Sequence, residues 1–462
     1  MKDCRNITKH IISVSIISAL LIMVYITPTL ALDPPETEWD NTFGGSGDDD
    51  GRSVQQTSDG GYIIVGYTNS YGAGLRDVFL IKTDADGNRE WDNTFGGSEN
   101  DNGYSVQQTL DGGYIITGDT WSFGPGGKDI WLIKTDANGN AVWDKTFGGA
   151  GDDSGSSVIQ TADWGYMIVG HTTSYGAGIY NAWLIKTDSE GNEEWNKTFG
   201  ESEQTYGFSI YKTLDGGYII SGCTSSYGAN FIDIWLIKTD ASGNAVWNKT
   251  FGGVGDDRSW GGSNAVYQTS DGGYIVTGWL TEAPFPSPNA DVWLIKTDTS
   301  GNEEWNKTFG GGDTDYGFSV CQSLDGGYII AGMTESFGAG GKDIWLIKTD
   351  SDGNKEWDKT IGGTNDDYGY SVRQTTDGSY IVAGDTKSFG AGGKDIWLIN
   401  VELPVILGDA NGDGSINAQD ITSVERIIVQ LDTATPMADA NQDGNINALD
   451  ITKVERLVAG LD

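Results

Sequence analysis

The chain is poor in the residues that most often carry out catalysis. Among its 462 residues are 2 histidines, 3 cysteines and 5 methionines. Outside the N-terminal segment His171 is the one remaining histidine, so the sequence offers no Ser-His-Asp or Cys-His arrangement for nucleophilic catalysis. Cys223 and Cys321 lie at non-equivalent places in different repeats, which argues against a disulfide framework.

Positive charge is also scarce. The chain has 28 Lys and Arg against 66 Asp and Glu, and its formal net charge is −38 at pH 7. Such a field repels nucleic acid and anionic lipid, so we expect neither as a partner. Most of these acids need no explanation beyond a solvated, acidic surface.

Long apolar runs are confined to the N-terminus. The run from Ile11 to Ile26 follows a basic start and precedes the small-residue site Thr29-Leu-Ala31. It is shorter than the ~20 apolar residues of a membrane-spanning helix, and three serines interrupt it. We therefore expect residues 1–31 to be a cleaved signal peptide. The mature protein would be secreted, or attached to the cell surface, and would have no membrane segment; an uncleaved anchor is the alternative.

What the chain has in abundance is glycine and tryptophan, arranged in a repeat. One pattern recurs seven times between residues 38 and 400, with its tryptophans mostly 52 residues apart. They are Trp39, Trp91, Trp143, Trp195, Trp247, Trp305 and Trp357. The one longer interval contains an insert, Pro284-Phe-Pro-Ser-Pro288. A strand-rich period of about 50 residues predicts a β-propeller.

Each unit predicts four strands. In the second unit these are residues 105–109, 114–118, 130–134 and 142–147, with a tight Asp-Gly-Gly turn between the first two. The middle strands are continuous apolar runs, so both of their faces must be covered, as they are between neighbouring blades.

The two ends of the repeat region complement each other. No fourth strand follows residues 395–400, whereas residues 38–43 form an orphan fourth strand at the start. Pairing them would remove two exposed sheet edges. We therefore predict an all-β seven-bladed β-propeller over residues 38–400, with the N-terminal strand closing the seventh blade.

The repeat unit resembles those of known propellers. Its second half, as in residues 343–357, resembles the latter part of a kelch-type blade, although Gly332 stands alone where kelch repeats carry a glycine pair. The whole unit resembles the FGG/DGGY repeats of extracellular propeller proteins.

A second repeat, of 30 residues, occupies residues 409–462. In each copy side-chain oxygens fall at loop positions 1, 3, 5, 9 and 12, glycine at 6, and a backbone carbonyl is offered at 7. This is the spacing with which a loop wraps Ca²⁺. The candidate ligands are Asp409, Asn411, Asp413, Ser415, Asn417 and Asp420, then Asp439, Asn441, Asp443, Asn445, Asn447 and Asp450.

Each loop leads into an amphipathic helix that starts Ile-Thr-x-Val-Glu-Arg, and no helix precedes the loop. Such paired half-motifs are similar to a type I dockerin domain, here a small all-α calcium-binding domain at residues 409–462 after a short linker, residues 401–408. The resemblance implies two calcium ions and a cohesin partner, often in polysaccharide-degrading assemblies. Loop positions 10 and 11, where cohesin is recognised, are Ala418-Gln419 and Ala448-Leu449 in place of the common Ser-Thr. Calcium that only stabilises a tail is the simpler alternative.

In the propeller, the 2–3 and 4–1 loops share one face and are the most varied. We expect Trp121, Trp260 and Phe285, in these loops, to contact a ligand. The aspartates of the 4–1 loops either cap turns and solvate the rim, or form a metal or glycan site. One position at the end of the second strand also varies, and we expect it to be exposed. It holds Tyr67, Asp119, His171, Cys223, Trp279, Met333 and Asp385.

Two functions are open. One is a propeller for binding or adhesion, to an extracellular glycan or another surface ligand, which the dockerin attaches to a cohesin-bearing partner. The alternative is a polysaccharide-active enzyme, a hydrolase or lyase, in a cellulosome-like complex. Two carboxylates in unlike environments at the central mouth would favour the enzyme, and an even circle of repeated residues would favour binding.

Overall fold

The structure is a computed structural model. It describes residues 34–227, 231–253, 255–258, 264–281 and 289–402, and, in the C-terminal region, residues 421–424, 427, 438, 440, 446 and 448–458.

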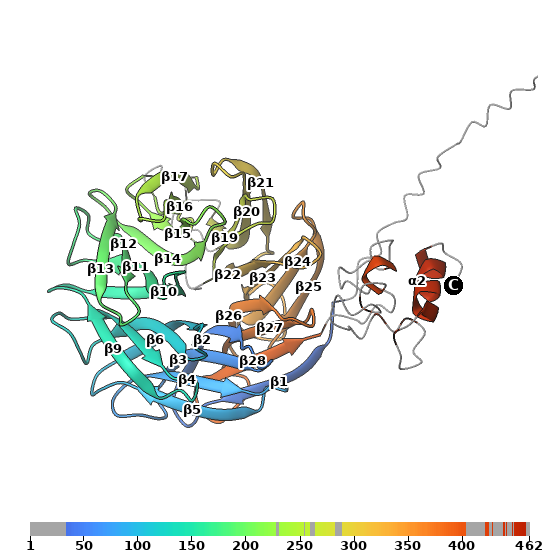
Figure 1. The fold of residues 1–462 in the computed structure, drawn as a ribbon, viewed down its shortest axis with the longest axis horizontal. Coiled ribbons are helices and arrows are strands. Elements are labelled where there is room, and N and C mark those ends of the chain that lie inside the picture. The colour runs from blue at the N-terminus through green and yellow to red at the C-terminus, as the bar shows by residue number, and fades with distance from the viewer. Residues whose placement is uncertain are drawn as a thin grey trace, which may run out of the picture. The chain divides into compact units, whose positions relative to one another are not determined.

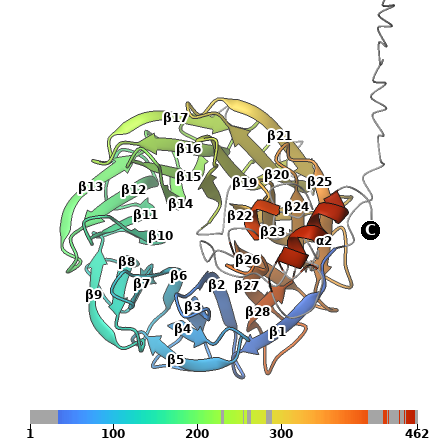
Figure 2. The ribbon, with the colours of Figure 1, turned by 45° about the vertical axis from the view of Figure 1, so that its right-hand side comes forward.

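The described residues of the repeat region form seven four-stranded antiparallel sheets around a common axis (Figures 1 and 2). Blade 1 consists of β2 (Asp49–Gln56), β3 (Tyr62–Thr68), β4 (Asp77–Thr83) and β5 (Arg89–Phe95). Blade 2 consists of β6 (Asp101–Gln108), β7 (Tyr114–Thr120), β8 (Asp129–Thr135) and β9 (Ala141–Phe147). Blade 3 consists of β10 (Asp153–Gln160), β11 (Tyr166–Thr172), β12 (Asn181–Thr187) and β13 (Glu193–Phe199). Blade 4 consists of β14 (Thr205–Lys212), β15 (Tyr218–Thr224), β16 (Asp233–Thr239) and β17 (Ala245–Phe251).

The remaining blades follow the same order. Blade 5 consists of β18 (Val266–Gln268), β19 (Tyr274–Thr281), β20 (Ala290–Thr297) and β21 (Glu303–Phe309). Blade 6 consists of β22 (Asp315–Gln322), β23 (Tyr328–Thr334), β24 (Asp343–Thr349) and β25 (Lys355–Ile361). Blade 7 consists of β26 (Asp367–Gln374), β27 (Tyr380–Thr386), β28 (Asp395–Val401) and β1 (Thr37–Phe43). The predicted seven-bladed propeller is confirmed.

The N-terminal strand is the outermost strand of blade 7. β1 pairs antiparallel with β28, and Phe43 lies opposite Ile396. Figure 2 shows β1 running along the outside of the ring beside β28. Because the first and last strands of the propeller share one sheet, the ring closes through backbone hydrogen bonds and leaves no unpaired strand edge at the junction.

The signature residues of the repeat pack one blade against the next. The fourth-strand tryptophan of one blade meets the tyrosine of the next blade's Asp-Gly-Gly-Tyr turn, as Trp39 meets Tyr62 with ring centroids 5.8 Å apart. The same indole covers the glycine of the next blade's second hairpin turn. There, a Cβ added to Gly87 would lie 2.6 Å from Trp39 Cη2. Tryptophan, tyrosine and glycine therefore recur together because most inter-blade contacts use one of each.

The lysine of the third strand is buried and paired. Lys82 Nζ lies 3.0 Å from Asp59 and 3.1 Å from Glu90, and it also donates to the carbonyl of Thr83. Equivalent lysine–aspartate pairs recur in blades 2 to 6 at 2.6–3.0 Å. The aspartate of the Asp-Gly-Gly turn is thus placed to neutralise a buried ammonium group.

The first aspartate of the first strand is buried and ties two loops together. Asp49 accepts hydrogen bonds from the Ser70 hydroxyl at 2.6 Å and the Gly45 amide at 2.8 Å, and the Thr68 hydroxyl also donates to it. The same bonds recur, with small changes, in most blades. Of the two interpretations of the 4–1 loop acids, turn capping holds for these aspartates. The expectation that they solvate the rim is wrong for them, because they are fully buried.

The C-terminal region contains α2 (Ala448–Val458). Its Val454 is buried with Val424, Ala438 and Ala440, and partly buried isoleucines surround this small core. Val458, which the helical pattern placed on the apolar face, is instead 42% exposed. No helix of the described residues has the length and apolar character needed to span a bilayer.

Candidate functional site: the axial channel

A channel along the propeller axis forms a cavity of about 960 Å³. Its wall is made by the innermost strands and by the ends of the second strands. In six blades the register of the first strand shifts by one residue, between Gly51 and Ser53 in blade 1. Such a bulge turns the extra side chain away from its normal direction. The extra residues are Arg52, Tyr104, Ser156, Phe208, Phe318 and Tyr370, and all six line the cavity.

The positions that line the channel are the ones at which the repeats differ. The varying residue at the end of the second strand, expected to be exposed, lies at the channel. Tyr67, Cys223, Trp279 and Met333 are between 0% and 7% exposed. His171 lines the cavity as well, so the interpretation of it as a surface residue is wrong. These side chains differ in kind between blades although they still pack across blade junctions, as Trp279 packs against Tyr316.

Blades 7, 1 and 2 supply a charged sector of the wall. Asp50 is held by Arg52 at 2.5 Å, by Lys394 at 3.1 Å and by the Tyr67 hydroxyl at 2.9 Å. Lys394 also lies 3.2 Å from Asp385. Both carboxyl groups are fully buried behind the cavity surface. They anchor the cations that border it.

The two carboxyl groups of this sector are unlike. Burial raises the pKa of Asp385 well above its usual range, and the neighbouring Asp50 charge adds to that effect. Burial would raise the pKa of Asp50 too, but Arg52 and Lys394 outweigh it and the net shift is downward. Asp385 is therefore the neutral partner and Asp50 the ionised one, joined by a hydrogen bond.

A second buried carboxylate, Asp119, belongs to the same sector. The Asn102 amide donates to it at 2.7 Å and the Ser154 hydroxyl at 2.8 Å, while Lys128 lies at 3.4 Å. Arg76 is different, because none of the described carboxylates forms an ion pair with it. Its guanidinium instead lies 4.5 Å from the centre of the Tyr67 ring and borders the cavity.

Blades 4 to 7 supply an aromatic sector. Trp279 and Tyr316 lie with ring centroids 4.3 Å apart, and Phe318 and Tyr370 lie 5.2 Å apart. Tyr206 continues the arc into blade 4. Arg258 and Lys342 border the cavity as well, so charged and aromatic side chains both line the channel.

His171 lies between the two sectors. Its ring meets Tyr206 edge-on at 5.1 Å and Tyr180 at 5.7 Å. Burial, helped by the charge of Lys128, lowers the pKa of His171 to about 3, so the imidazole is neutral near neutral pH. Its Nδ1 accepts no hydrogen bond from the described residues.

Trp121, one of the three loop residues expected to contact a ligand, is 47% exposed and does not border the cavity. Trp260 and Phe285 lie outside the described residues. The sequence predicted a ligand site on the long loops, so the channel residues were not predicted. The signal that could have found them was the variation of adjacent positions within otherwise constant strands.

Of the twelve candidate calcium ligands, the structure describes Asp450. It is fully buried in the first turn of α2, as expected for the carboxylate that ends a loop and begins a helix. The other eleven lie outside the described residues. A buried carboxylate at that place, together with the oxygen-only donor set of the sequence, fits a hard cation such as Ca²⁺.

Comparison with known families identifies the C-terminal part. The sequence model of the dockerin type I domain matches residues 407–459. No curated protein matches the chain. A Dyadobacter fermentans protein of unknown function shares 11% identity over 79% of this chain and 99% of its own, with a TM-score of 0.42.

Two further solved structures are similar to a comparable degree. The Pan2 WD40 domain of Neurospora crassa shares 10% identity over 80% of this chain and 98% of its own, with a TM-score of 0.48. Sqt1 of Chaetomium thermophilum shares 10% identity over 80% of this chain and 100% of its own, with a TM-score of 0.43. At these scores the likeness adds nothing to the fold that the strands define.

Dockerin domains bind cohesin domains and generally bind calcium, so the C-terminal region implies attachment to a cohesin-bearing protein in a cellulosome-like context. The chain therefore combines a seven-bladed β-propeller with a C-terminal dockerin type I domain.

Proposed function

We propose that the propeller is a carbohydrate-binding module whose ligand enters the axial channel, and that the dockerin attaches this module to a cohesin-bearing scaffold outside the cell. The proposal rests on one observation, the divergence of the channel positions in a protein that otherwise repeats itself. A specific site requires side chains of different kinds that line one cavity, and the channel positions meet that requirement.

The composition of the wall favours a sugar. Aromatic rings such as Trp279 and Tyr316 offer apolar faces on which the C–H face of a pyranose can stack. Arg76, which also borders the cavity, offers a charged donor for hydroxyl groups. A ligand that is apolar on its faces and polar on its edges matches both kinds of group.

One observation bears on the enzyme alternative. Asp50 and Asp385 are unlike carboxyl groups, as acid–base catalysis requires. However, they share a hydrogen bond and are fully buried, whereas the carboxyl groups of glycosidases stand about 5–9.5 Å apart around the bond to be cleaved. This geometry suits an anchor for Arg52 and Lys394 better than a catalytic pair.

Binding to a glycan array, followed by calorimetry with the ligand that the array identifies, tests the proposal. Replacing Tyr316 or Arg76 with alanine should each weaken binding about tenfold or more, a loss of about 1.4 kcal/mol. Phe337→Ala is the matched control, because this ring is 44% exposed on a 2–3 loop and does not border the cavity. Unchanged affinity in both channel variants would refute the assignment, and hydrolysis of the ligand that Asp385→Asn abolishes would instead support an enzyme.

A further inference from the structure

Blade 3 breaks the repeat in the turn between its first two strands. Six blades have glycine at the third position of this turn, with φ between 83° and 93°. They are Gly60, Gly112, Gly216, Gly272, Gly326 and Gly378. Blade 3 has Trp164 there with φ 70°, and among the described residues it is the one non-glycine residue with positive φ. A bulky side chain in this conformation is strained, and such strain persists most often where function maintains it.

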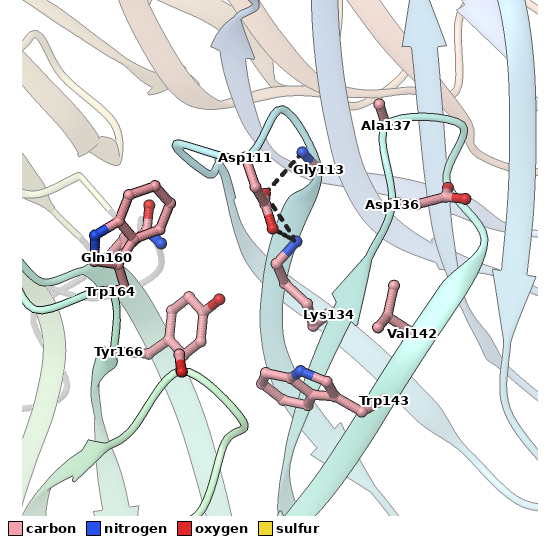
Figure 3. Close-up of a pocket in the computed structure, with 11 residues that line it drawn as sticks. Asp111, Gly113, Lys134, Asp136, Ala137, Val142, Trp143, Gln160, Trp164 and Tyr166 are labelled. Atoms are coloured by element: carbon pink, nitrogen blue, oxygen red, sulfur yellow. Dashed lines mark hydrogen bonds and ion pairs between the residues drawn. The ribbon is translucent and has the colours of Figure 1, made fainter.

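The strained turn places a large aromatic ring at the surface. Trp164 is 50% exposed, and its indole N–H donates to none of the described residues. It borders a pocket of about 240 Å³ at the junction of blades 2 and 3, shown in Figure 3. Trp143 and Tyr166 also line the pocket, while Asp111 and Lys134 form the ion pair drawn beside them.

A second departure from the repeat lies in the same pocket. Val142, 61% exposed, stands where five other blades have glutamate and blade 4 has valine. Four of these glutamates, Glu90, Glu194, Glu304 and Glu356, lie within 3.1 Å of the buried lysine of their blade. Lys134 has no such glutamate. Its ammonium group contacts both oxygens of Asp111 and the Thr135 carbonyl.

The side-chain amide of Gln160 is another polar group of the pocket that differs from its equivalents in other blades. In four other blades the glutamine that ends the first strand donates its amide to the turn carbonyl, at 2.9–3.3 Å. Gln160 accepts a hydrogen bond from Leu110, but its Nε2 donates to none of the described residues. The pocket thus combines an exposed indole face with three donor groups, from Lys134, Gln160 and Trp164.

We propose that this Trp164 pocket is a second carbohydrate site, which takes a neutral pyranose ring with equatorial hydroxyl groups. The C–H face of such a ring stacks on the indole of Trp164, and the three donors bind its hydroxyl oxygens. Asp111 and Asp136 outnumber Lys134 in the lining, so the pocket disfavours an anionic sugar. The site lies at the Asp-Gly-Gly turns and does not depend on the channel proposed above.

The test is titration of the full-length protein with cellohexaose and xylohexaose, by calorimetry and by saturation-transfer NMR. Trp164→Gly restores the residue of the other six blades. It should weaken binding at least tenfold while the melting temperature stays the same or rises, because the strained φ is relieved. Val142→Glu leaves the turn intact and gives Lys134 its missing partner. It should also weaken binding.

The channel variant Tyr316→Ala separates this site from the channel, and it should bind both oligosaccharides as the parent does. The proposal is overturned if the parent binds neither oligosaccharide, or if Trp164→Gly and Val142→Glu bind as tightly as the parent. Loss of binding in Tyr316→Ala alone would place the oligosaccharide in the channel and also overturn it.

Discussion

The contact that closes the ring can be measured with a pair of glycines. Gly60 and Gly87 both have positive φ, at 88° and 76°, and both lie in hairpin turns of blade 1. A Cβ at Gly60 would meet nothing within 4 Å, whereas a Cβ at Gly87 would collide with the ring of Trp39. Trp39 belongs to the N-terminal strand in blade 7, so the collision occurs across the closing junction.

Alanine at the two positions should therefore cost different amounts. The left-handed conformation costs about 1–2 kcal/mol, and the stiffer unfolded chain returns about 0.4–1 kcal/mol, so Gly60→Ala should destabilise by about 0.5–1 kcal/mol. Gly87→Ala carries the same cost plus about 1–3 kcal/mol for overpacking against the indole. The excess reports the contact between the first strand and blade 1.

Urea unfolding followed by tryptophan fluorescence measures both variants, alone and combined with Trp39→Ala. With the indole removed, Gly87→Ala should cost no more than Gly60→Ala, so the excess should disappear in the double variant. Equal costs for the two glycines in the parent background would refute the closing contact. An excess that persists without Trp39 would refute it as well.

Three other predictions concern pH and calcium. Burial raises the pKa of Asp129, so the contribution of this residue to stability should fall as the pH rises above the ordinary aspartate pKa of 3.8. Asp129→Asn, which copies Asn181 of blade 3, should therefore flatten the pH dependence of the melting temperature above pH 4. The hydrogen bond from Thr213 is the largest factor that lowers the pKa of Asp215 to about 2. This aspartate should therefore stabilise the fold above pH 4, and the stabilisation should disappear as the pH falls towards 2. In Asp215→Asn this loss of stability at low pH should be absent. Chelation of calcium, or Asp409→Ala with Asp439→Ala, should abolish binding of the full-length protein to cohesin while the β-sheet circular dichroism of the propeller remains; binding that survives both would refute the two loop sites.

The sequence predicted the blades well because core packing forces the same residues to recur. Trp39 and its equivalents must meet a tyrosine and a glycine in the next blade, so a spacing of 52 residues carries the architecture. The orphan strands at the two ends then predicted the sheet in which β1 and β28 pair.

The channel could not be predicted in the same way. A repeat argument treats variation as an absence of constraint, and an unconstrained residue is usually exposed. His171, Cys223 and Met333 differ in kind between blades, yet all three line the cavity. The bulges that direct Arg52 and Tyr370 inward cannot be recognised from the hydrophobic pattern of the strands. Each bulged residue lies between a glycine and a serine, and both residue types are also common in turns.

The position of β1 has a consequence for the order of folding during synthesis. Phe43 is made about 350 residues before its partner Ile396, which at about 5–20 residues per second is a delay of roughly 20–70 s. Throughout that interval the first strand has no partner, and blade 1 lacks the indole that covers its turn. A chain released early would carry an unpaired strand at its start and an unfinished blade at its end, two edges able to join with those of another copy. Completion of the ring is therefore also the step that removes the molecule's capacity to polymerise.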